Sequence, residues 1–393
     1  MINLMAPINQ LGYGIASLNI LKALQEKTKV SLFPIGKPQI PLEKKSRLFV
    51  NQLDAEAVRK GLETAKTFDP NAPCIKIWHQ NQMAERIGSG KFIGFPIFEL
   101  DTFDSIEKNH LSSCDELMVC SHWAKNVVMD QCPPITHSVP SYSSRYPIIH
   151  TEGKKDWAKV HVIPLGVDST VFGHTMRVLP DPRYSSTVFF NCGKWEIRKG
   201  HDILIDAFKK AFPGDEDVQL WMMCENPFNS PDEDRWWHNK YDDPRVVIIP
   251  RVESQEEVYN IMRKADCGVF PARAEGWNLE ALEMMAGGKQ VIISDFSAHT
   301  EFCTEENSML VTIDDTEIAY DGKWFHGQGN WAKIGDNQIK QIAQHMKNVH
   351  KRVQNHENTF NVAGVETAKK FSWQNSAGKI MEALNDKPNK DRK

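Results

Sequence analysis

The sequence contains no C-x-x-C pair and no long apolar run. Its eight cysteines lie apart from one another between Cys74 and Cys303, which argues against a structural zinc site or a disulfide framework. No stretch approaches the roughly 18 apolar residues of a transmembrane helix. Residues 1–10 lack the basic start of a secretory signal peptide. We therefore expect a cytoplasmic chain with reduced cysteines and no transmembrane segment.

A strong net charge and several catalytic motifs are also absent. The net charge is −4 over 393 residues, which argues against a strong electrostatic grip on nucleic acid or an acidic membrane. A modest basic cluster remains, formed by Lys37, Lys44, Lys45 and Arg47. The G-x-x-x-x-G-K-[ST], G-x-S-x-G and H-E-x-x-H patterns do not occur, so a P-loop enzyme, a hydrolase with a nucleophile elbow and an H-E-x-x-H metalloprotease are not indicated.

Short apolar runs alternate with segments of helical period, and the series restarts near residue 186. The runs predict strands at 2–5, 29–33, 74–78, 91–95, 116–120 and 160–164, then at 186–193, 218–224, 245–250, 266–271, 289–294 and 308–313. Continuous apolar strands separated by helices are typical of parallel sheets buried on both faces. We therefore predict an α/β protein with two Rossmann-like, doubly wound domains.

The predicted boundaries follow from this rhythm. We place an N-terminal domain at 1–170, a C-terminal domain at 171–370, a final helix at 371–385 and a tail at 386–393. Residues 225–244 and 314–337 interrupt the pattern, and the first of these is interpreted as a polar loop with two tryptophans. The sequence Asp-Glu-Asp occurs at 215–217 and 232–234; solvated turns are favoured there over an Asp-x-Asp metal site.

The segment AEGWNLEALEMMAGG, residues 274–288, follows a predicted strand. Gly276 permits a close backbone turn, and a helix is expected to begin near Asn278. The free amides and the dipole of that helix start suit a phosphate or a sugar hydroxyl. Glu275 can accept hydrogen bonds from a sugar, and Glu283, about two turns on, can reach ribose hydroxyls. The alternative is an acid that favours the helix dipole, followed by a solvated glutamate.

Two further turns between strand and helix can hold phosphate. Gly193, Arg198 and Lys199 follow one strand, and their two cations suit a diphosphate; an ordinary exposed basic loop is the alternative. Gly12 and Gly14 follow the first strand in the pattern G-x-G-x-x-S. That pattern, without an acid at the end of the second strand, argues against a dinucleotide fingerprint, so the loop is a phosphate or acceptor loop or a tight turn.

The sequence resembles glycosyltransferase family 4, whose fold is the two-domain GT-B fold. The segments that carry the resemblance are GKWEIRKGHDILIDAF, ADCGVFPARAEGWNLEALEMMAGGKQVI and VIPLGVD, with FELDTF and DELMVCSHWAKNVV in the N-terminal half. The similarity covers roughly residues 1–385 and is most specific in the C-terminal half.

The resemblance implies roles for particular residues. In the family, the positions matching Arg198 and Lys199 bind the donor diphosphate, and the E-x7-E pair matching Glu275 and Glu283 contacts the donor sugar and the ribose. The remaining implied positions are the backbone amides around Trp277, Asn278 and Leu279, the glycine-rich loop at Gly14, and His79 beside the transferring sugar. The family often has glycine where this chain has Asn278, and Glu301 matches an acid that anchors a loop.

The resemblance also implies a reaction. We expect a retaining glycosyltransferase that uses a nucleotide-diphosphate sugar and needs neither a metal nor another cofactor. The fold that the resemblance implies places the acceptor on the N-terminal domain, 1–170, and the nucleotide-sugar donor on the C-terminal domain, 171–370. The acceptor is open: a glycan, a lipid-linked sugar, a protein, a metabolite or modified DNA. Two alternatives remain, namely a non-catalytic nucleotide-sugar-binding or scaffold protein, and a transferase acting on modified bases in DNA.

Overall fold

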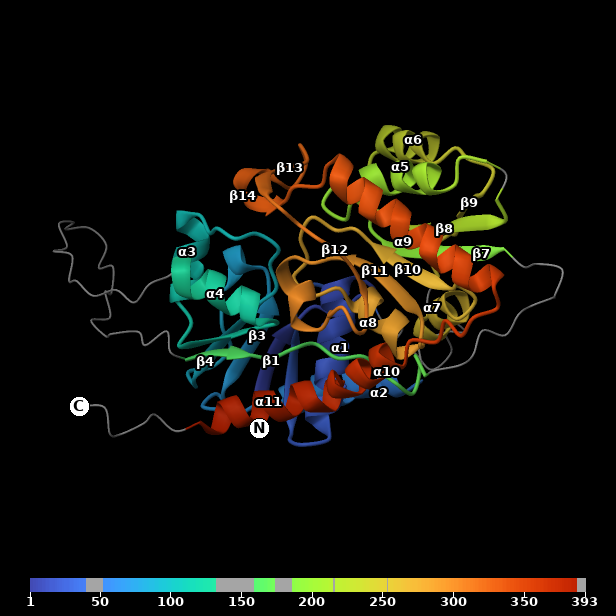
Figure 1. Cartoon of the computed structure of the whole chain (residues 1–393). Helices are drawn as coiled ribbons and strands as arrows, with labels where there is room; N and C mark the ends of the chain where they lie inside the picture. The colour runs from blue at the N-terminus through green and yellow to red at the C-terminus, as the bar shows by residue number, and fades with distance from the viewer. Residues whose placement is uncertain (40–51, 132–158, 174–185, 215, 253, 387–393) are drawn as a thin grey trace.

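The computed structural model describes residues 1–39, 52–131, 159–173, 186–214, 216–252 and 254–386 (Figure 1). Two six-stranded parallel sheets are present, and their strand orders are β2-β1-β3-β4-β5-β6 and β12-β11-β10-β7-β8-β9. The first comprises β1 (Ile2–Ala6), β2 (Val30–Pro34), β3 (Cys74–Trp78), β4 (Phe92–Pro96), β5 (Glu116–Val119) and β6 (Val160–Val162). The second comprises β7 (Thr187–Gly193), β8 (Val218–Cys224), β9 (Val246–Ile248), β10 (Cys267–Phe270), β11 (Gln290–Ser294) and β12 (Met309–Val311). The predicted α/β class is confirmed.

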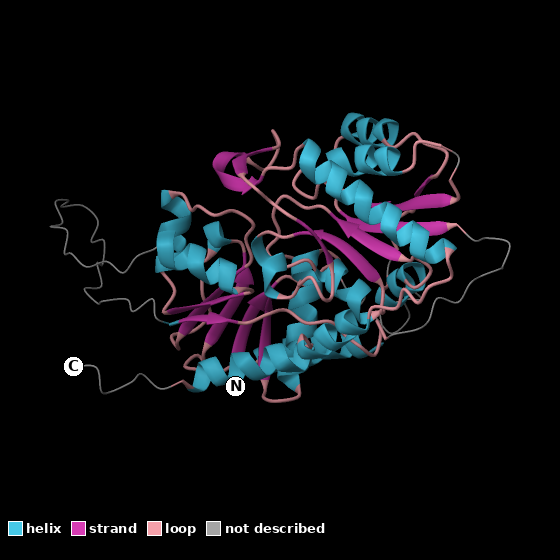
Figure 2. Ribbon diagram, in the orientation of Figure 1, coloured by secondary structure: helices cyan, strands magenta, loops and turns pink. Residues whose placement is uncertain are grey.

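Helices cover both sheets (Figure 2). Around the first sheet are α1 (Gly12–Gln25), α2 (Gln52–Ala65), α3 (Ser105–Ser112), α4 (His122–Gln131) and the short turn η1 (Gln80–Gln82). The second sheet carries α5 (His201–Ala211), α6 (Pro231–Lys240), α7 (Gln255–Met262), α8 (Leu279–Ala286), the turn η3 (Ser297–Glu301), α9 (Asp336–Gln354) and α10 (Val362–Lys370). The last helix is α11 (Trp373–Asn385).

Strand β7 shows why the second sheet is buried on both faces. Phe189 packs in the apolar cluster formed with α5 and α9, whereas Val188, Phe190 and Cys192 pack in the cluster formed with α8. Successive strand residues point to opposite faces, so an uninterrupted apolar run fits a strand covered on both sides.

The last helix, α11, crosses back to the first sheet. Ala377 and Ile380 share a core cluster with Ile20 and Leu21 of α1, and Ser376 Oγ donates to the carbonyl oxygen of Pro164 over 2.6 Å. The predicted division at residue 170 adjoins the undescribed segment 174–185 and remains a prediction. Of the predicted basic cluster, Lys44, Lys45 and Arg47 lie outside the described residues, as does the tail from 387.

The prediction of a polar loop at 225–244 is wrong in part, because α6 occupies residues 231–240. A capping box explains the helix start: Ser230 Oγ accepts from the Glu233 amide, and the Glu233 side chain accepts from the Ser230 amide. The acidic run 232–234 therefore forms a first helical turn, where the dipole favours negative charge. Residues 314–337 contain the antiparallel hairpin β13 (Thr316–Tyr320) and β14 (His326–Ala332).

The segment after β4, residues 97–103, connects the two halves of the molecule; we call it the β4 loop. Ile97 O accepts from Tyr13 Oη in α1. Asp101 accepts from the backbone amide of Asn330 in β14 over 2.8 Å. A second bridge joins Glu301 to α4, since its carboxylate accepts from the His122 amide over 2.8 Å. No helix in the described ranges is long and apolar enough to cross a membrane.

Candidate active site

The site lies where β7 and β10 end at their carboxyl edges. These strands are neighbours in the second sheet, so the residues that follow them meet, as ligand-binding residues do in open α/β sheets. Residues 194–200 follow β7 and lead into α5, whose first residue follows Gly200, a residue with φ 73°. Residues 271–278 follow β10 and lead into α8, which Asn278 caps.

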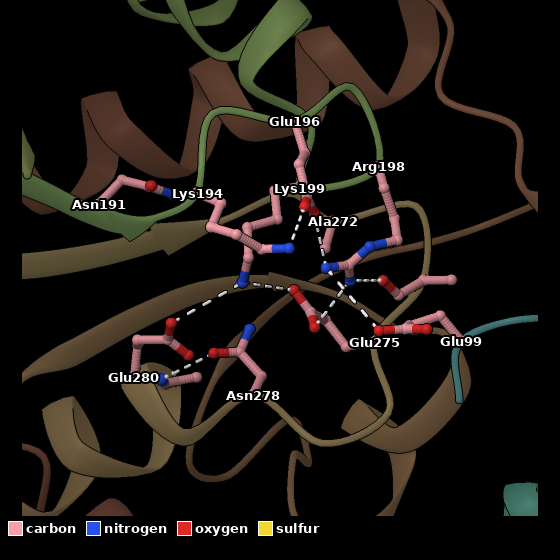
Figure 3. Close-up of polar contacts among 12 residues, drawn as sticks. Glu99, Asn191, Lys194, Glu196, Arg198, Lys199, Ala272, Glu275, Asn278 and Glu280 are labelled. Atoms are coloured by element: carbon pink, nitrogen blue, oxygen red, sulfur yellow. Dashed lines mark hydrogen bonds and ion pairs between the residues drawn. The ribbon is translucent and has the colours of Figure 1, made fainter. Parts of the chain in front are cut away.

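Glu275 is held between two cations (Figure 3). Its Oε2 lies 2.9 Å from Arg198 Nη1, and its Oε1 lies 2.9 Å from Lys199 Nζ. Arg198 Nη1 also donates to the Ala274 carbonyl over 2.7 Å. Arg198 and Glu275 are 5% and 6% exposed, so the two charges are desolvated together. The sequence therefore brings three of its predicted site residues, 76 or 77 positions apart, into direct contact.

More carboxylates surround the pair. Glu196 accepts from Arg198 over 2.8 Å and pairs with Lys194 over 2.6 Å. Glu99, from the β4 loop of the other sheet, lies 3.9 Å from Arg198. Glu280 Oε1 lies 3.8 Å from Lys199 Nζ. Four carboxylates therefore share three cations, and the cluster carries a formal charge near −1 when all are ionised.

The electrostatics separate these carboxyls into two kinds. Burial alone would raise the pKa of Glu275, but Arg198 and then Lys199 outweigh it and hold that pKa well below the ordinary value. Burial raises the pKa of Glu99, against the opposing effect of Arg198 and with the support of Glu275. Glu275 is thus a firmly ionised carboxylate, and Glu99 takes a proton more readily than Glu275 does.

Asn278 starts α8 in a left-handed conformation, with φ 93° and ψ 80°. Its Oδ1 accepts from the Ala281 amide over 3.0 Å, and its Nδ2 lies 3.0 Å from His299 Nε2. Burial lowers the pKa of His299 to about 4, and its Nδ1 donates to the Ser294 carbonyl, so the neutral Nε2 accepts from Asn278. The backbone thus turns at Asn278 in a region that glycine adopts most easily.

Gly276 brings the backbone of the second half against the first half. A Cβ at Gly276 would lie 2.6 Å from a methyl carbon of Ile97 and 3.0 Å from the Phe98 carbonyl oxygen. A side chain there would force the β4 loop away. The Glu275 amide is held by Ser297 Oγ over 2.9 Å, which fixes the turn from the other side.

Trp277 and Leu279 lie at the site through their backbone only. Both side chains are buried in the large apolar cluster, and the Trp277 ring lies 5.0 Å from that of Phe302. Any contact of these two residues with a ligand at the helix start is therefore a contact of the amide groups.

Glu283 is a buried carboxyl on the second turn of α8. It is 8% exposed, and burial, followed by the charge of Glu280, raises its pKa well above the ordinary value. No hydrogen bond or ion pair to its carboxyl occurs within the described segments. Beside it, Cys192, Lys199, Glu275 and Asn278 line an internal space of about 10 Å³, which is enough for a single water.

The predicted residues of the first half lie in a separate group. Gly14 is in the first turn of α1, where a Cβ would lie 2.2 Å from the Asn9 carbonyl oxygen. His79 is exposed, and its ring centroid lies 4.6 Å from that of Tyr13. The rings of Tyr13 and Trp78 cover one part of the imidazole, and this partial desolvation, followed by the charge of Lys194, lowers the pKa of His79. Gly193 ends β7 with φ 140°.

Sequence reasoning missed four charged members of this site: Glu99, Lys194, Glu196 and Glu280. Lys194, Glu196 and Arg198 alternate along the segment after β7, and this period of two is the signal that groups them. Glu99 lies in FELDTF, one of the segments that carry the resemblance, but nothing local shows that it meets Arg198, because the two are far apart in sequence.

Residues 186–321 match the family model described as Glycosyl transferases group 1. This segment is a group 1 glycosyltransferase domain. It contains Arg198, Lys199, Glu275 and Glu283. Two curated sequences, from two strains of Mycobacterium tuberculosis, are similar to the chain; both are named GDP-mannose-dependent alpha-(1-6)-phosphatidylinositol dimannoside mannosyltransferase. They are 23% identical to it over 226 residues, 56% of this chain and 51% of each relative. The chain therefore matches about half the length of these relatives.

Solved structures resemble the whole chain that carries this glycosyltransferase domain. Sucrose-phosphate synthase from Thermosynechococcus elongatus aligns with a TM-score of 0.65 at 16% identity, covering 98% of both chains. Anabaena HepE, in complex with UDP and glucose, aligns with a TM-score of 0.66 at 16% identity, covering 98% of this chain and 99% of that one. Trehalose-6-phosphate synthase OtsA aligns with a TM-score of 0.63 at 11% identity, covering 99% and 100%. These similarities confirm the predicted GT-B fold.

Proposed function

We propose that the protein is a retaining glycosyltransferase that moves a sugar from a nucleotide-diphosphate sugar to an acceptor hydroxyl. The observation that carries this proposal is the meeting of Arg198, Lys199 and Glu275 beside the start of α8. This cluster lies within the segment that matches the group 1 glycosyltransferases. A scaffold protein has no need to bury this arrangement of charges at a sheet edge that faces another domain.

The proposed donor diphosphate lies against Arg198, Lys199 and the free amides at the start of α8. Transfer breaks the bond between the sugar C1 and the phosphate oxygen, so negative charge grows on the leaving diphosphate. Fixed cations and oriented amides stabilise that charge at little cost in reorganisation, because they are held in place before the reaction. Arg198 is fixed by the Ala274 carbonyl and by Glu196, which supports its role as a fixed rather than a mobile cation.

The two glutamates of the E-x7-E motif take different roles in this proposal. Glu275 is ionised and fixed, which suits it to accept hydrogen bonds from hydroxyls of the donor sugar. Glu283 is buried with a raised pKa and no partner among the described residues, and a buried polar group of this kind gains from a hydroxyl partner. We assign to it the ribose hydroxyls. His79 and the loop at Gly14 face the sugar from the first half.

The acceptor oxygen forms the new bond to C1, and its proton passes to the leaving phosphate oxygen or to water. This chemistry requires no electron transfer, and the cations of the site suffice for the charge of the leaving group, so we propose no resident cofactor or metal. The similar proteins differ in their nucleotide: the mycobacterial proteins are named GDP-mannose-dependent, whereas HepE was solved with UDP and glucose. The donor nucleotide of this protein is therefore identified by a binding experiment.

The test is thermal unfolding of the full chain with UDP, GDP, ADP, CDP or dTDP, their sugar conjugates, and NAD as a control. A ligand at about 100 times its dissociation constant adds roughly 2.7 kcal/mol of stability. Lys199→Ala should lose the shift. Lys210→Ala is the matched control, since Lys210 is an exposed lysine on α5 of the same domain.

A nucleotide that stabilises the wild type and the Lys210→Ala variant, but not Lys199→Ala, names the donor class. Release of the nucleoside diphosphate from the matching sugar conjugate then establishes transfer. Binding without release supports the alternative of a nucleotide-sugar-binding protein. If no nucleotide diphosphate binds, the donor site as proposed does not exist.

A further inference from the structure

A second pocket lies beside the charged site. It has a volume of about 370 Å³ and is formed by residues 195–197, two asparagines before α6 (Asn226 and Asn229), helix α6 and the turn between β13 and β14. In Figure 1, α6 and the β13–β14 hairpin both lie along the top of the C-terminal half, and the ion pair of Lys323 with Glu233 joins them. The volume falls within the range of roughly 300–1,000 Å³ that is typical of small-molecule sites.

Tryptophan side chains form much of the wall. Trp195 and Trp237 are buried and stacked, with ring centroids 5.3 Å apart and an angle of 14° between planes. Trp236 and Trp324 also line the pocket, and they are 51% and 45% exposed. Burying a tryptophan is strongly favourable, so two half-exposed indoles at one pocket are costly unless a ligand covers them.

The polar groups of the pocket are held by hydrogen bonds and ion pairs within the protein. Lys323 Nζ lies 3.0 Å from Asn229 Oδ1 and 2.9 Å from Glu233 Oε1. Asp321 accepts from three backbone amides of its own turn, those of residues 323, 324 and 325. Glu196, which also lines the pocket, is paired with Lys194 and Arg198. The pocket is lined by one ammonium group, Lys323, and by four carboxylates, those of Glu196, Asp232, Glu233 and Asp321. It therefore offers mainly oxygen acceptors, with one ammonium donor, on a frame held by hydrogen bonds.

We propose that this pocket binds a neutral saccharide unit. A sugar ring presents an apolar C–H face that can lie on an indole, and hydroxyls at its edge that pair with carboxylate, amide and ammonium groups. A quaternary ammonium ligand would also suit tryptophan rings, but Glu196, Asp232 and Glu233 are already paired with cations of the protein, and Asp321 accepts from backbone amides. A purely apolar ligand would leave no role for the ordered groups around Lys323.

The position of the pocket assigns a role to that saccharide. Glu196 lines the pocket and bonds Arg198, which bonds Glu275, so the pocket adjoins the proposed donor site through one shared side chain. We infer that the saccharide is a unit of the acceptor, remote from the reacting hydroxyl. This second step rests on the proposed function, whereas saccharide binding itself does not.

The test uses the full chain with Trp236→Ala and Trp324→Ala. Tyr320→Ala is the matched control, because Tyr320 is a 63% exposed aromatic residue on the same hairpin that does not line the pocket. Each protein is applied to a printed array of neutral, acidic and amino oligosaccharides, and each hit is titrated in solution by tryptophan fluorescence. Choline is titrated in parallel. Nucleotide binding is measured on the same samples.

A neutral oligosaccharide should bind the wild type and Tyr320→Ala, with at least tenfold loss in both tryptophan variants and unchanged nucleotide binding. Binding of choline alone, of acidic sugars alone, or of no sugar on the array would overturn the proposal, as would a hit that both variants retain. If the wild-type protein binds a neutral oligosaccharide but no nucleotide, the result would support the saccharide site and contradict the proposed transferase. If the hit serves as acceptor, the variants should raise its KM more than they lower kcat.

Discussion

The two sides of the segment 194–199 differ sharply in chemistry although they share one stretch of backbone. On one side Glu196, Arg198 and Lys199 join Glu275 in a buried ion cluster. On the other side Trp195 and Ile197 join the apolar cluster of α5 and α6. Alternation of side chains separates Trp195 from Glu196, and the turn at residues 197–200 brings both Arg198 and Lys199 to the charged side. Six residues thus supply both a charged site and the wall of an aromatic pocket.

The difference matters for how each side is held together. The aromatic side is stable by itself, because apolar burial needs no partner of opposite charge. The charged side is stable only while its charges are balanced, since a buried ion without its partner is strongly unfavourable. The ion pairs of the charged site can therefore rearrange, or its carboxyls can take up a proton, when a charged ligand binds. The packing of the aromatic wall does not depend on such a change.

The largest expected effects come from Arg198→Ala and Trp237→Ala, one on each side. Arg198→Ala leaves Glu275 and Glu196 buried without their shared cation, which should cost roughly 3–5 kcal/mol at neutral pH. Trp237 is 5% exposed, and its truncation should cost about 3–5 kcal/mol through lost apolar burial. Urea unfolding measures both values.

The dependence on pH separates these two variants. Arg198 holds the pKa of Glu275 below its ordinary value, so the contribution of this pair is present above the unfolded pKa of about 4.3 and is lost as the pH falls through the folded pKa. The cost of Arg198→Ala should therefore shrink in acid, and that of Trp237→Ala should not. If the loss of unfolding free energy depends on pH in the same way for both variants, the ion pair of Arg198 with Glu275 does not contribute to stability as predicted.

An intermediate effect is expected from Glu99, the carboxyl whose pKa burial raises. A bound diphosphate would bring negative charge close to Arg198 and raise the pKa of Glu99 further, so the complex would hold more protons than the free protein. Affinity for a nucleotide sugar should then fall as the pH rises through that pKa. Glu99→Gln should remove this part of the pH dependence and strengthen binding by up to about tenfold at high pH, since one pKa unit equals about 1.4 kcal/mol.

Calorimetry with a nucleotide sugar measures this effect, because its diphosphate does not titrate between pH 5 and 8. Glu63→Gln is the control, since Glu63 is an exposed glutamate of the same half, paired with Lys66 on the surface. Identical pH profiles for the wild type and Glu99→Gln would exclude the proposed coupling and place the diphosphate away from the β4 loop.

Local patterns were enough to predict the fold and the strand positions. Each buried strand is a short apolar run, and Gly193, Gly276 and Asn278 mark the turns that follow the strands. The same patterns pointed to Arg198, Lys199 and Glu275, because each directly follows a strand. What they lacked was the identity of the partner: the sequence suggests cations for a phosphate, and in the structure those cations hold Glu275 and Glu196.

The missed features depend on contacts that are distant in sequence. Helix α6 has a polar surface, and Trp237 is its single buried residue. It therefore lacks the apolar periodicity that predicts a helix, and the sequence predicts a loop there. Its capping box, Ser230 with Glu233, was the available signal. Glu99 and the pocket between α6 and the hairpin require the packing of segments more than eighty residues apart, which no local period encodes.

The smallest expected effect concerns Asn278, which begins α8 in a left-handed conformation. Asn278→Gly and Asn278→Ala both remove the hydrogen bond to His299 and the cap on the Ala281 amide, so these losses cancel when the two variants are compared. Alanine retains the penalty of a positive φ, here 93°, whereas glycine does not. Asn278→Ala should therefore be less stable than Asn278→Gly by about 1 kcal/mol in urea unfolding. If the Asn278→Ala variant is as stable as the Asn278→Gly variant, the backbone at the start of α8 has relaxed in the alanine variant. The left-handed turn would then not hold the amides of α8 in a fixed direction, and these amides could not be what positions the diphosphate.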